Sequence, residues 1–289
     1  MNTKRVVQEL NKKYKDFISS IDDRNIRSLI INQTFITGGA IVSLLNNEKP
    51  NDFDIYFDNQ DACETVINYF LDKMDKKLDE DYYIHKKINI KNNDEEEFKN
   101  RLKIYIPQTG TFSNNFYNNR YYPIFVSSNA ISLTDKIQLI FRFIGNPEEI
   151  HANYDFEHTK CYYIPKLNKL VLPQKSLECI LTKELIYTGS KYPLASILRT
   201  RKFIKRGWNI NVGQYVKMAI QLNEFDLKDP VILSDQLVGV DIVLFDMVIA
   251  EIRKKENNIT TSEIIEILDR VFDKSEKVDW DKEIYKNKE

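Results

Sequence analysis

The segment DFDIYF at residues 52–57 constrains the fold more than any other part of this sequence. Its positions alternate in kind: the apolar side chains are Phe53, Ile55 and Phe57, and the others are Asp52, Asp54 and Tyr56. Successive side chains of a strand point to opposite faces of a sheet. The alternation therefore predicts a half-buried strand that carries both aspartates on its open face.

A glycine pair precedes this strand. The β-prone run Phe35-Ile36-Thr37 ends at Gly38-Gly39, a short helix is expected over 40–45, and the polar residues 46–50 read as a loop. A glycine turn at a helix start offers bare backbone N–H groups to a phosphate, and Ser43, one turn further, would add a hydroxyl. A tight strand-to-helix turn without a ligand is the simpler explanation of the pair taken alone.

The pattern along the chain changes near residue 175. Before it, helices are expected at 4–20 and 22–32, and β-prone stretches occur at 121–126, 137–143, 152–156 and 162–172. After it, the pattern is helical throughout, at 176–188, 194–206, 212–223, 232–255 and 261–273. We therefore expect an α+β fold: a domain at 1–175 with a small mixed sheet and flanking helices, and an all-helical domain at 176–289.

Composition narrows the functional classes. The 289 residues are 42% hydrophobic and 29% charged, which is ordinary for a soluble protein. No apolar run approaches the roughly 20 residues of a membrane span, so no membrane partner is expected. The three cysteines are scattered and form no CxxC pair. The N-terminus is charged and does not resemble a signal peptide. Together with the scattered cysteines, it predicts a cytoplasmic protein.

Positive charge is concentrated in one stretch. The net charge is −1, so binding of a polyanion should be local. Residues 183–206 contain a single acidic residue, Glu184, and these cationic residues: Lys183, Lys191, Arg199, Arg201, Lys202, Lys205 and Arg206. This stretch is the candidate surface for a nucleic acid.

The two aspartates suit a metal site. Residues i and i+2 of a strand lie side by side, so Asp52 and Asp54 present two carboxylates that repel each other unless a cation joins them. Mg²⁺ prefers such oxygen ligands. Paired ions can bridge the attacking oxygen and the triphosphate in nucleotidyl transfer.

The segment FITGGAIVSLLNNEKPNDFDIYF, residues 35–57, resembles the signature of the DNA polymerase β-like nucleotidyltransferase superfamily. Its spacing is similar to bacterial poly(A) polymerases and CCA-adding enzymes, although Val42-Ser43 replace an Arg-Asp pair of that helix. The resemblance implies transfer of an NMP from an NTP such as ATP, with two Mg²⁺ or Mn²⁺ ions. The phrase IHANYDF also resembles uncharacterised bacteriophage proteins of this kind, for which the host cytoplasm would be the location.

The same resemblance implies a third carboxylate from a later strand. Asp155 is the candidate and Glu157 the alternative, while a strand-end aspartate with local hydrogen bonds is the simpler explanation. The stretch NYDFEHTKCYY resembles a sugar-contacting Asp-Phe motif of CCA-adding enzymes. Zinc binding by His151, His158 and Cys161 is disfavoured, because their spacing is short and no second pair is near.

Residues 191–210, KYPLASILRTRKFIKRGWNI, are similar to a nucleotide-binding helix of the same enzymes. The resemblance implies nucleotide contacts from Arg199 and Lys202, and a solvated basic helix is the alternative.

The leading hypothesis is therefore addition of nucleotides to an RNA 3′ end without a template. Two alternatives remain open: nucleotidylation of a small molecule or a protein, and a module that kept the fold but lost catalysis.

Overall fold

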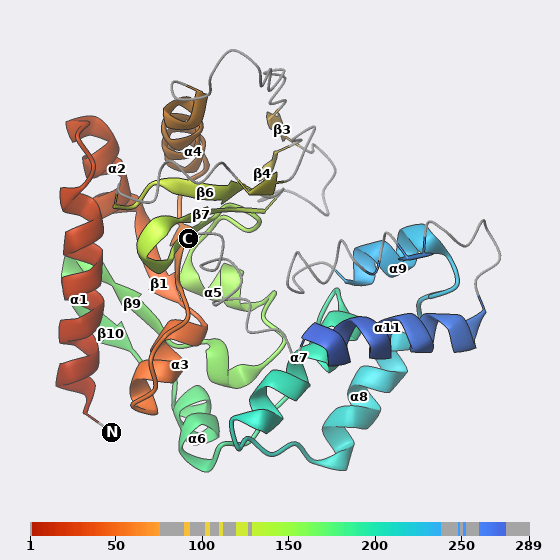
Figure 1. Cartoon of the computed structure of the whole chain (residues 1–289). Coiled ribbons are helices and arrows are strands. Elements are labelled where there is room, and N and C mark those ends of the chain that lie inside the picture. The colour runs from red at the N-terminus through yellow and green to blue at the C-terminus, as the bar shows by residue number, and fades with distance from the viewer. Residues whose placement is uncertain are drawn as a thin grey trace, which may run out of the picture. The chain divides into compact units, whose positions relative to one another are not determined.

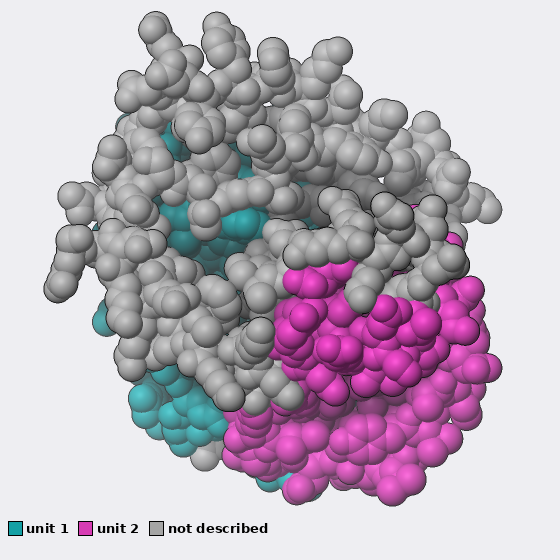
Figure 2. All heavy atoms as spheres, turned by 45° about the vertical axis from the view of Figure 1, so that its right-hand side comes forward, with its two compact units in different colours: residues 1–182 teal, residues 183–289 magenta. Residues whose placement is uncertain are grey.

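The computed structural model describes residues 2–75, 90–92, 102–104, 110–111, 120–126, 129–237, 248, 251–252 and 260–275. The chain forms two compact units, residues 1–182 and 183–289 (Figure 2). The first mixes helices with strands, and the named elements of the second are helices. The expected α+β class with a helical C-terminal part is thus confirmed.

A mixed sheet forms the centre of the first unit, in the order β10-β9-β1-β2-β8-β7-β6-β5 (Figure 1). Its strands are β1 (Thr34–Thr37), β2 (Phe53–Phe57), β5 (Gly110–Thr111), β6 (Pro123–Val126), β7 (Ala130–Leu133), β8 (Ile137–Ile140), β9 (Tyr162–Ile164) and β10 (Lys169–Val171). Strands β2 and β8 run parallel, and the other neighbours run antiparallel. A separate antiparallel pair joins β3 (Ile90–Asn92) and β4 (Leu102–Ile104). The strand that carries Asp54 therefore lies inside the sheet, between β1 and β8.

One face of this sheet belongs to the core. The strand register places five side chains in one row across β9, β1, β2, β8 and β7: Tyr163, Ile36, Ile55, Leu139 and Ile131. Each of them is fully buried. Burying an aliphatic side chain of this size contributes about 1.5–3 kcal/mol, so the row fixes which face of β2 points inward.

Helices α1 (Thr3–Ser19), α2 (Arg24–Gln33) and α4 (Gln60–Asp75) pack in the same unit. Phe17 of α1 stacks on Phe70 of α4 with ring centroids 6.3 Å apart. Helix α2 begins at residue 24 rather than 22, because the Asp23 side chain accepts hydrogen bonds from the N–H groups of Asn25 and Ile26 and so caps the helix.

The expectation of a strand at 152–156 was wrong. Helix α5 (Pro147–His151) precedes a turn at these positions, and the short helix η4 (Glu157–Thr159) follows it. Asn146 and Glu149 form a capping box, since each side chain binds the other's backbone N–H, and Pro147 occupies the first turn. These capping residues start a helix where apolar residues alone suggested a strand.

Helix α6 (Gln174–Thr182) ends before the residue 188 expected for it. It lies in the first unit and contacts η4, where the Ser176 hydroxyl donates a hydrogen bond of 3.2 Å to Glu157 Oε1. The compact unit therefore extends past residue 175. The functional division into a catalytic domain at 1–175 and a substrate-binding domain at 176–289 stays a prediction.

The second unit contains α7 (Pro193–Lys205), α8 (Val212–Leu222), α9 (Pro230–Gln236) and α11 (Thr261–Ser275). An apolar cluster joins α7, α9 and α11, and the partly buried Leu222 of α8 packs against it; its buried members are Leu194, Leu233, Leu237, Val248, Ile252, Ile264, Ile267 and Val271. A capping box opens α11, because the side chains of Thr260 and Glu263 each accept a hydrogen bond from the other's backbone N–H. Much of the helix expected at 232–255 lies outside the described residues. In the described part of the chain, no helix is long and apolar enough to cross a membrane.

Candidate functional site

The open face of the sheet carries a polar row opposite the buried one. The register aligns side chains of β9, β1, β2, β8 and β7 in the order Tyr162, Thr37, Asp54, Gln138 and Ser132. Thr37 is fully buried, and the other four are partly exposed. Asp54 therefore lies in the middle of a polar line, as the alternation of β2 predicted.

Asp52 lies directly before β2, two residues from Asp54. Its Oδ2 accepts a hydrogen bond of 3.2 Å from the side-chain amide of Gln138. Burial raises the pKa of Asp54 well above its usual value, and the nearby charge of Asp52 raises it further. Both effects penalise a second negative charge at this place, and a bound cation would relieve them.

Gly38 forms the turn between β1 and helix α3 (Gly39–Leu45). Its φ of 89° and ψ of −146° lie in a region that L residues rarely adopt. A Cβ at this position would lie 3.5 Å from Asp54 Oδ2 and 3.8 Å from the Tyr154 hydroxyl oxygen. The glycine turn, the carboxylate and the phenol therefore meet at one point, and the turn leaves this point free of a side chain of its own.

A hydrogen-bond network lies behind this point. The Thr37 hydroxyl donates to the backbone carbonyl of Cys161 at 2.9 Å, and its oxygen lies 2.8 Å from His151 Nε2. The Tyr154 hydroxyl forms hydrogen bonds with the hydroxyls of Thr37 and Tyr56. Burial, followed by the charge of Lys160, lowers the pKa of His151 to about 4. His151 is thus neutral at pH 7.

The same residues take part in a closed circuit of aromatic rings. Neighbouring ring centroids lie 5.0–6.3 Å apart around the series Phe35, Tyr56, Tyr154, His151 and Tyr162, which returns to Phe35. Phe35 and His151 are buried, while the three tyrosines are partly exposed. Rings at such distances pack favourably, so the circuit gives the polar groups beside Asp54 a rigid support. The sequence did not reveal it because its members come from β1, β2, α5, the turn after α5 and β9.

The candidates for a third carboxylate, Asp155 and Glu157, come from the segment that follows α5. Asp155 is buried in the bend after α5, and Glu157 is buried in η4. Glu157 bonds with Ser176 and forms an ion pair of 3.2 Å with Lys160. Among the described residues, no group of three or more His, Cys, Asp or Glu side chains could hold a metal ion. The structure therefore brings Asp52 and Asp54 together but does not group Asp155 or Glu157 with them, and the role of either as a third carboxylate stays a prediction.

Ser43, Arg199 and Lys202 were also predicted to bind the nucleotide. Ser43 lies in α3 and is buried, with 7% of its surface exposed. Arg199 and Lys202 lie on α7, where Lys202 is exposed and the Arg199 Nε donates to the Ala195 carbonyl one turn earlier. Their roles in nucleotide binding stay predictions.

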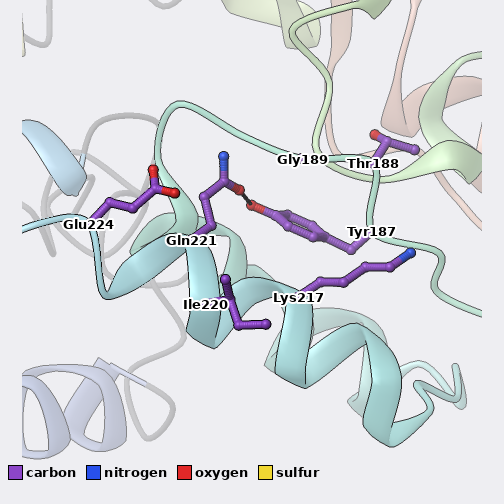
Figure 3. A pocket seen from close by; sticks show the side chains of 7 residues that line it. All are labelled: Tyr187, Thr188, Gly189, Lys217, Ile220, Gln221 and Glu224. Carbon is purple, nitrogen blue, oxygen red and sulfur yellow. Dashed lines mark hydrogen bonds between the residues drawn. The ribbon is translucent and has the colours of Figure 1, made fainter.

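The second unit has a hollow of its own, about 430 Å³ in volume (Figure 3). It lies between the loop at 187–189 and the C-terminal half of α8. The Tyr187 hydroxyl donates a hydrogen bond to Gln221 Oε1, and Lys217 and Glu224 also line the hollow (Figure 3).

A family profile matches residues 8–183 of this chain: that of the Gabija anti-defense 2 family proteins, Gad2. The chain belongs to the Gabija anti-defense 2 family. The matched range closely follows the first compact unit, residues 1–182. It therefore contains the Gly38 turn and both β2 aspartates, whereas Arg199 and Lys202 lie beyond it.

A curated relative of this Gad2-family chain is "Gabija anti-defense 2" of Bacillus phage SPbetaL7. The two are 22% identical over 268 residues, which is 92% of this chain and 55% of the relative. The chain thus spans about half the length of the relative that it matches.

The solved structures with partial similarity are two CCA-adding enzymes and a tRNA-processing enzyme. One is the CCA-adding enzyme of Bacillus stearothermophilus with CTP, at 12% identity over 75% of this chain and 47% of that one, with a TM-score of 0.37. Another is the CCA-adding enzyme of Thermotoga maritima with tRNA, at 11% identity over 86% of this chain and 57% of that one, with a TM-score of 0.39. A third is a tRNA-processing enzyme with CTP (10%, 82% and 54%, 0.40). Likeness of this degree carries no information about activity.

Proposed function

We propose that this Gad2-family chain is a phage anti-defence protein whose first unit is a Mg²⁺-dependent nucleotidyltransferase. The single observation that carries the enzymatic part is the geometry around Asp54. Its carboxylate, the second carboxylate of Asp52 and the Gly38 turn lie together at the middle of a polar sheet face. The anti-defence role rests on family membership and on the name of the phage relative.

The donor set suits a divalent cation. Two carboxylates whose mutual charge raises the pKa of one of them gain free energy when a cation binds. Asp52 and Asp54 would hold Mg²⁺, which would supply charge neutralisation to a triphosphate when bound. Two carboxylates offer few ligands for a pair of ions. We therefore propose one ion at Asp52 and Asp54, and a second ion stays a prediction.

In the proposed reaction, an acceptor hydroxyl oxygen forms a bond with the α-phosphorus of an NTP. The bond between that phosphorus and the pyrophosphate oxygen breaks, pyrophosphate leaves, and the hydroxyl proton passes to solvent. The chain contributes orientation: the Gly38 turn admits a phosphate close to the backbone, and the aspartates fix the charge of the site on a rigid strand. This reaction would place the chain in the DNA polymerase β-like superfamily.

We propose an RNA 3′ end as the acceptor and an NTP such as ATP as the donor. The support is charge: α7 ends in the cations Lys202 and Lys205, followed by Arg206. Basic residues in the last turn also stabilise a helix through its dipole, so the cations do not identify RNA by themselves. A small molecule or a protein in the host cytoplasm is the alternative acceptor.

One observation favours a second candidate function, a nucleotide-binding module without catalysis. Asp155, the expected third carboxylate, does not group with the β2 aspartates in the described structure. A site with two carboxylates can bind a metal–nucleotide complex without completing the transfer.

One experiment separates these functions. The protein is incubated with Mg²⁺ and each α-labelled NTP in the presence of RNA, tRNA and protein pools, beside the variant Asp54→Asn. Label in RNA that depends on Asp54 supports the proposal, and label in protein or in a small molecule changes the acceptor. Nucleotide binding without any labelled product supports the silent module. Absence of both overturns the nucleotidyltransferase assignment.

A further inference from the structure

Gln138 of β8 lies beside both aspartates of the site. The parallel register pairs it with Asp54 across β2 and β8, so the two side chains are neighbours on the open face of the sheet. Its side-chain amide reaches back along β2 and donates a hydrogen bond of 3.2 Å to Asp52 Oδ2. Gln138 therefore binds one carboxylate and lies next to the other.

The acceptor determines how this amide is turned. An ionised carboxylate can only accept hydrogen bonds, so Gln138 must direct its NH₂ group, and not its carbonyl oxygen, toward Asp52. The Gln138 side chain is partly exposed, and Asp52 and Asp54 are partly exposed as well. The bond therefore lies on the same open face where we propose that a cation binds.

Asp52 depends on such a bond more than Asp54 does. Asp54 lies within β2, where pairing with β1 and β8 fixes its backbone, whereas Asp52 precedes the strand. A second bond ties the same approach to the start of β8, since Lys136 Nζ donates to the Pro50 carbonyl oxygen at 3.3 Å. Residues at the start of β8 thus hold the segment that carries Asp52.

The residue type at position 138 also sets the charge beside the two aspartates. A glutamate would have nearly the same shape, but it would add a third negative charge and repel Asp52 where the amide now binds it. Among the described residues, no group of three or more His, Cys, Asp or Glu side chains could hold a metal ion. Glutamine therefore fills this position with a neutral hydrogen-bond donor.

We infer that Gln138 is a positioning residue of the metal site, whose amide holds the Asp52 carboxylate in place beside Asp54 without adding charge. The inference rests on the proposed function and adds a residue that sets how tightly the two aspartates bind a divalent cation. Removal of a hydrogen-bond partner of a metal ligand lowers metal affinity by about 10- to 100-fold.

Binding of Mn²⁺ tests this role without any turnover. Free Mn²⁺ is followed by electron paramagnetic resonance while the whole protein is titrated, and Mg²⁺ is then added as a competitor. Gln138→Met keeps the length of the side chain but removes the donor, and it should bind Mn²⁺ about 10- to 100-fold more weakly than wild type. Gln138→Glu supplies a third carboxylate, so it should bind Mn²⁺ more tightly than Gln138→Met and should melt below wild type without metal.

Gln60→Met is the matched control. Gln60 of α4 donates a similar, partly buried hydrogen bond of 3.1 Å to Glu64 Oε1. Each methionine variant loses one bond between an amide and a carboxylate, so the two should lower the melting temperature of the metal-free protein by similar amounts. Gln138→Met should weaken Mn²⁺ binding, and Gln60→Met should leave it at the wild-type value.

Asp54→Asn separates the inference from the proposed function. If Asp54→Asn loses Mn²⁺ binding but Gln138→Met keeps the wild-type affinity, the inference is wrong and the proposed metal site stands. If Gln138→Glu binds Mn²⁺ no more tightly than Gln138→Met, position 138 does not act on the ion and the inference is also wrong. If wild type binds Mn²⁺ no better than Asp54→Asn, the proposed metal site fails and the inference fails with it.

Discussion

Replacement of Gly38 by alanine gives the sharpest test of the turn beside Asp54. The backbone there has φ 89° and ψ −146°, a conformation that is almost restricted to glycine. Holding another residue in such a region costs about 1–3 kcal/mol. The new Cβ would lie 3.5 Å from Asp54 Oδ2, an ordinary van der Waals distance, so strain rather than a clash sets the cost.

For a unit of this size, each kcal/mol shifts the melting temperature by about 2–4 °C. We therefore expect Gly38→Ala to melt about 2–12 °C below wild type in a thermal scan followed by circular dichroism. Nucleotide binding should weaken as well, because the methyl group would occupy the point between Asp54 and Tyr154.

Gly39→Ala is the matched control. Gly39 starts α3, and a Cβ there would have no atom within 4 Å. Alanine at a compatible position stabilises by about 0.4–1 kcal/mol through the unfolded chain. The reasoning about the turn is refuted if Gly38→Ala melts with or above Gly39→Ala.

Three further predictions concern charge. Burial and the charge of Asp52 raise the pKa of Asp54, so ionisation of this carboxyl lowers the free energy of unfolding as the pH rises from 3.8 through the folded pKa. Without Mg²⁺ at pH 7, Asp54→Asn should therefore unfold at a higher temperature than wild type. Mg²⁺ should stabilise only wild type. A lower melting temperature of the metal-free variant would indicate a structural role for the carboxylate. The pKa of His151 is lowered from 6.5 to about 4, so the neutral imidazole contributes to the free energy of unfolding above pH 6.5, and this contribution is lost as the pH falls toward 4. Wild type should lose stability relative to His151→Gln between these pH values. Parallel pH profiles of the two proteins would contradict this. Arg199→Ala/Lys202→Ala should lower the slope of log affinity for RNA against log salt by about 0.7 for each lost phosphate contact; an unchanged slope would leave α7 a solvated basic helix.

The motif around β2 could be predicted from sequence because its information is local. The period-two alternation that ends at Phe57 places Asp54 on the open face, and Gly38 marks the turn that needs a positive φ. Each of these signals lies within a few residues of the structure that it determines. The core row through Ile55 then selects the face, because a one-residue shift would bury the aspartate.

The network behind the motif could not be predicted in this way. Thr37 meets His151 and the Cys161 carbonyl across more than a hundred residues, and no spacing rule connects them. The bend at Asp155 could have been predicted, since Asn146-Pro147 with Glu149 is a helix-start signature that outweighs the β propensity of the following residues.

The transfer of a labelled α-phosphate tests the central claim most directly. ATP labelled at the α-position and ATP labelled at the γ-position are incubated in parallel with Mg²⁺, the RNA pool and either wild type or Asp52→Asn/Asp54→Asn. The account predicts that α-label enters the acceptor and γ-label leaves with pyrophosphate, and that the double variant transfers neither. Transfer of γ-label, or equal α-label transfer by the double variant, would contradict the assignment of nucleotidyl transfer to these two aspartates.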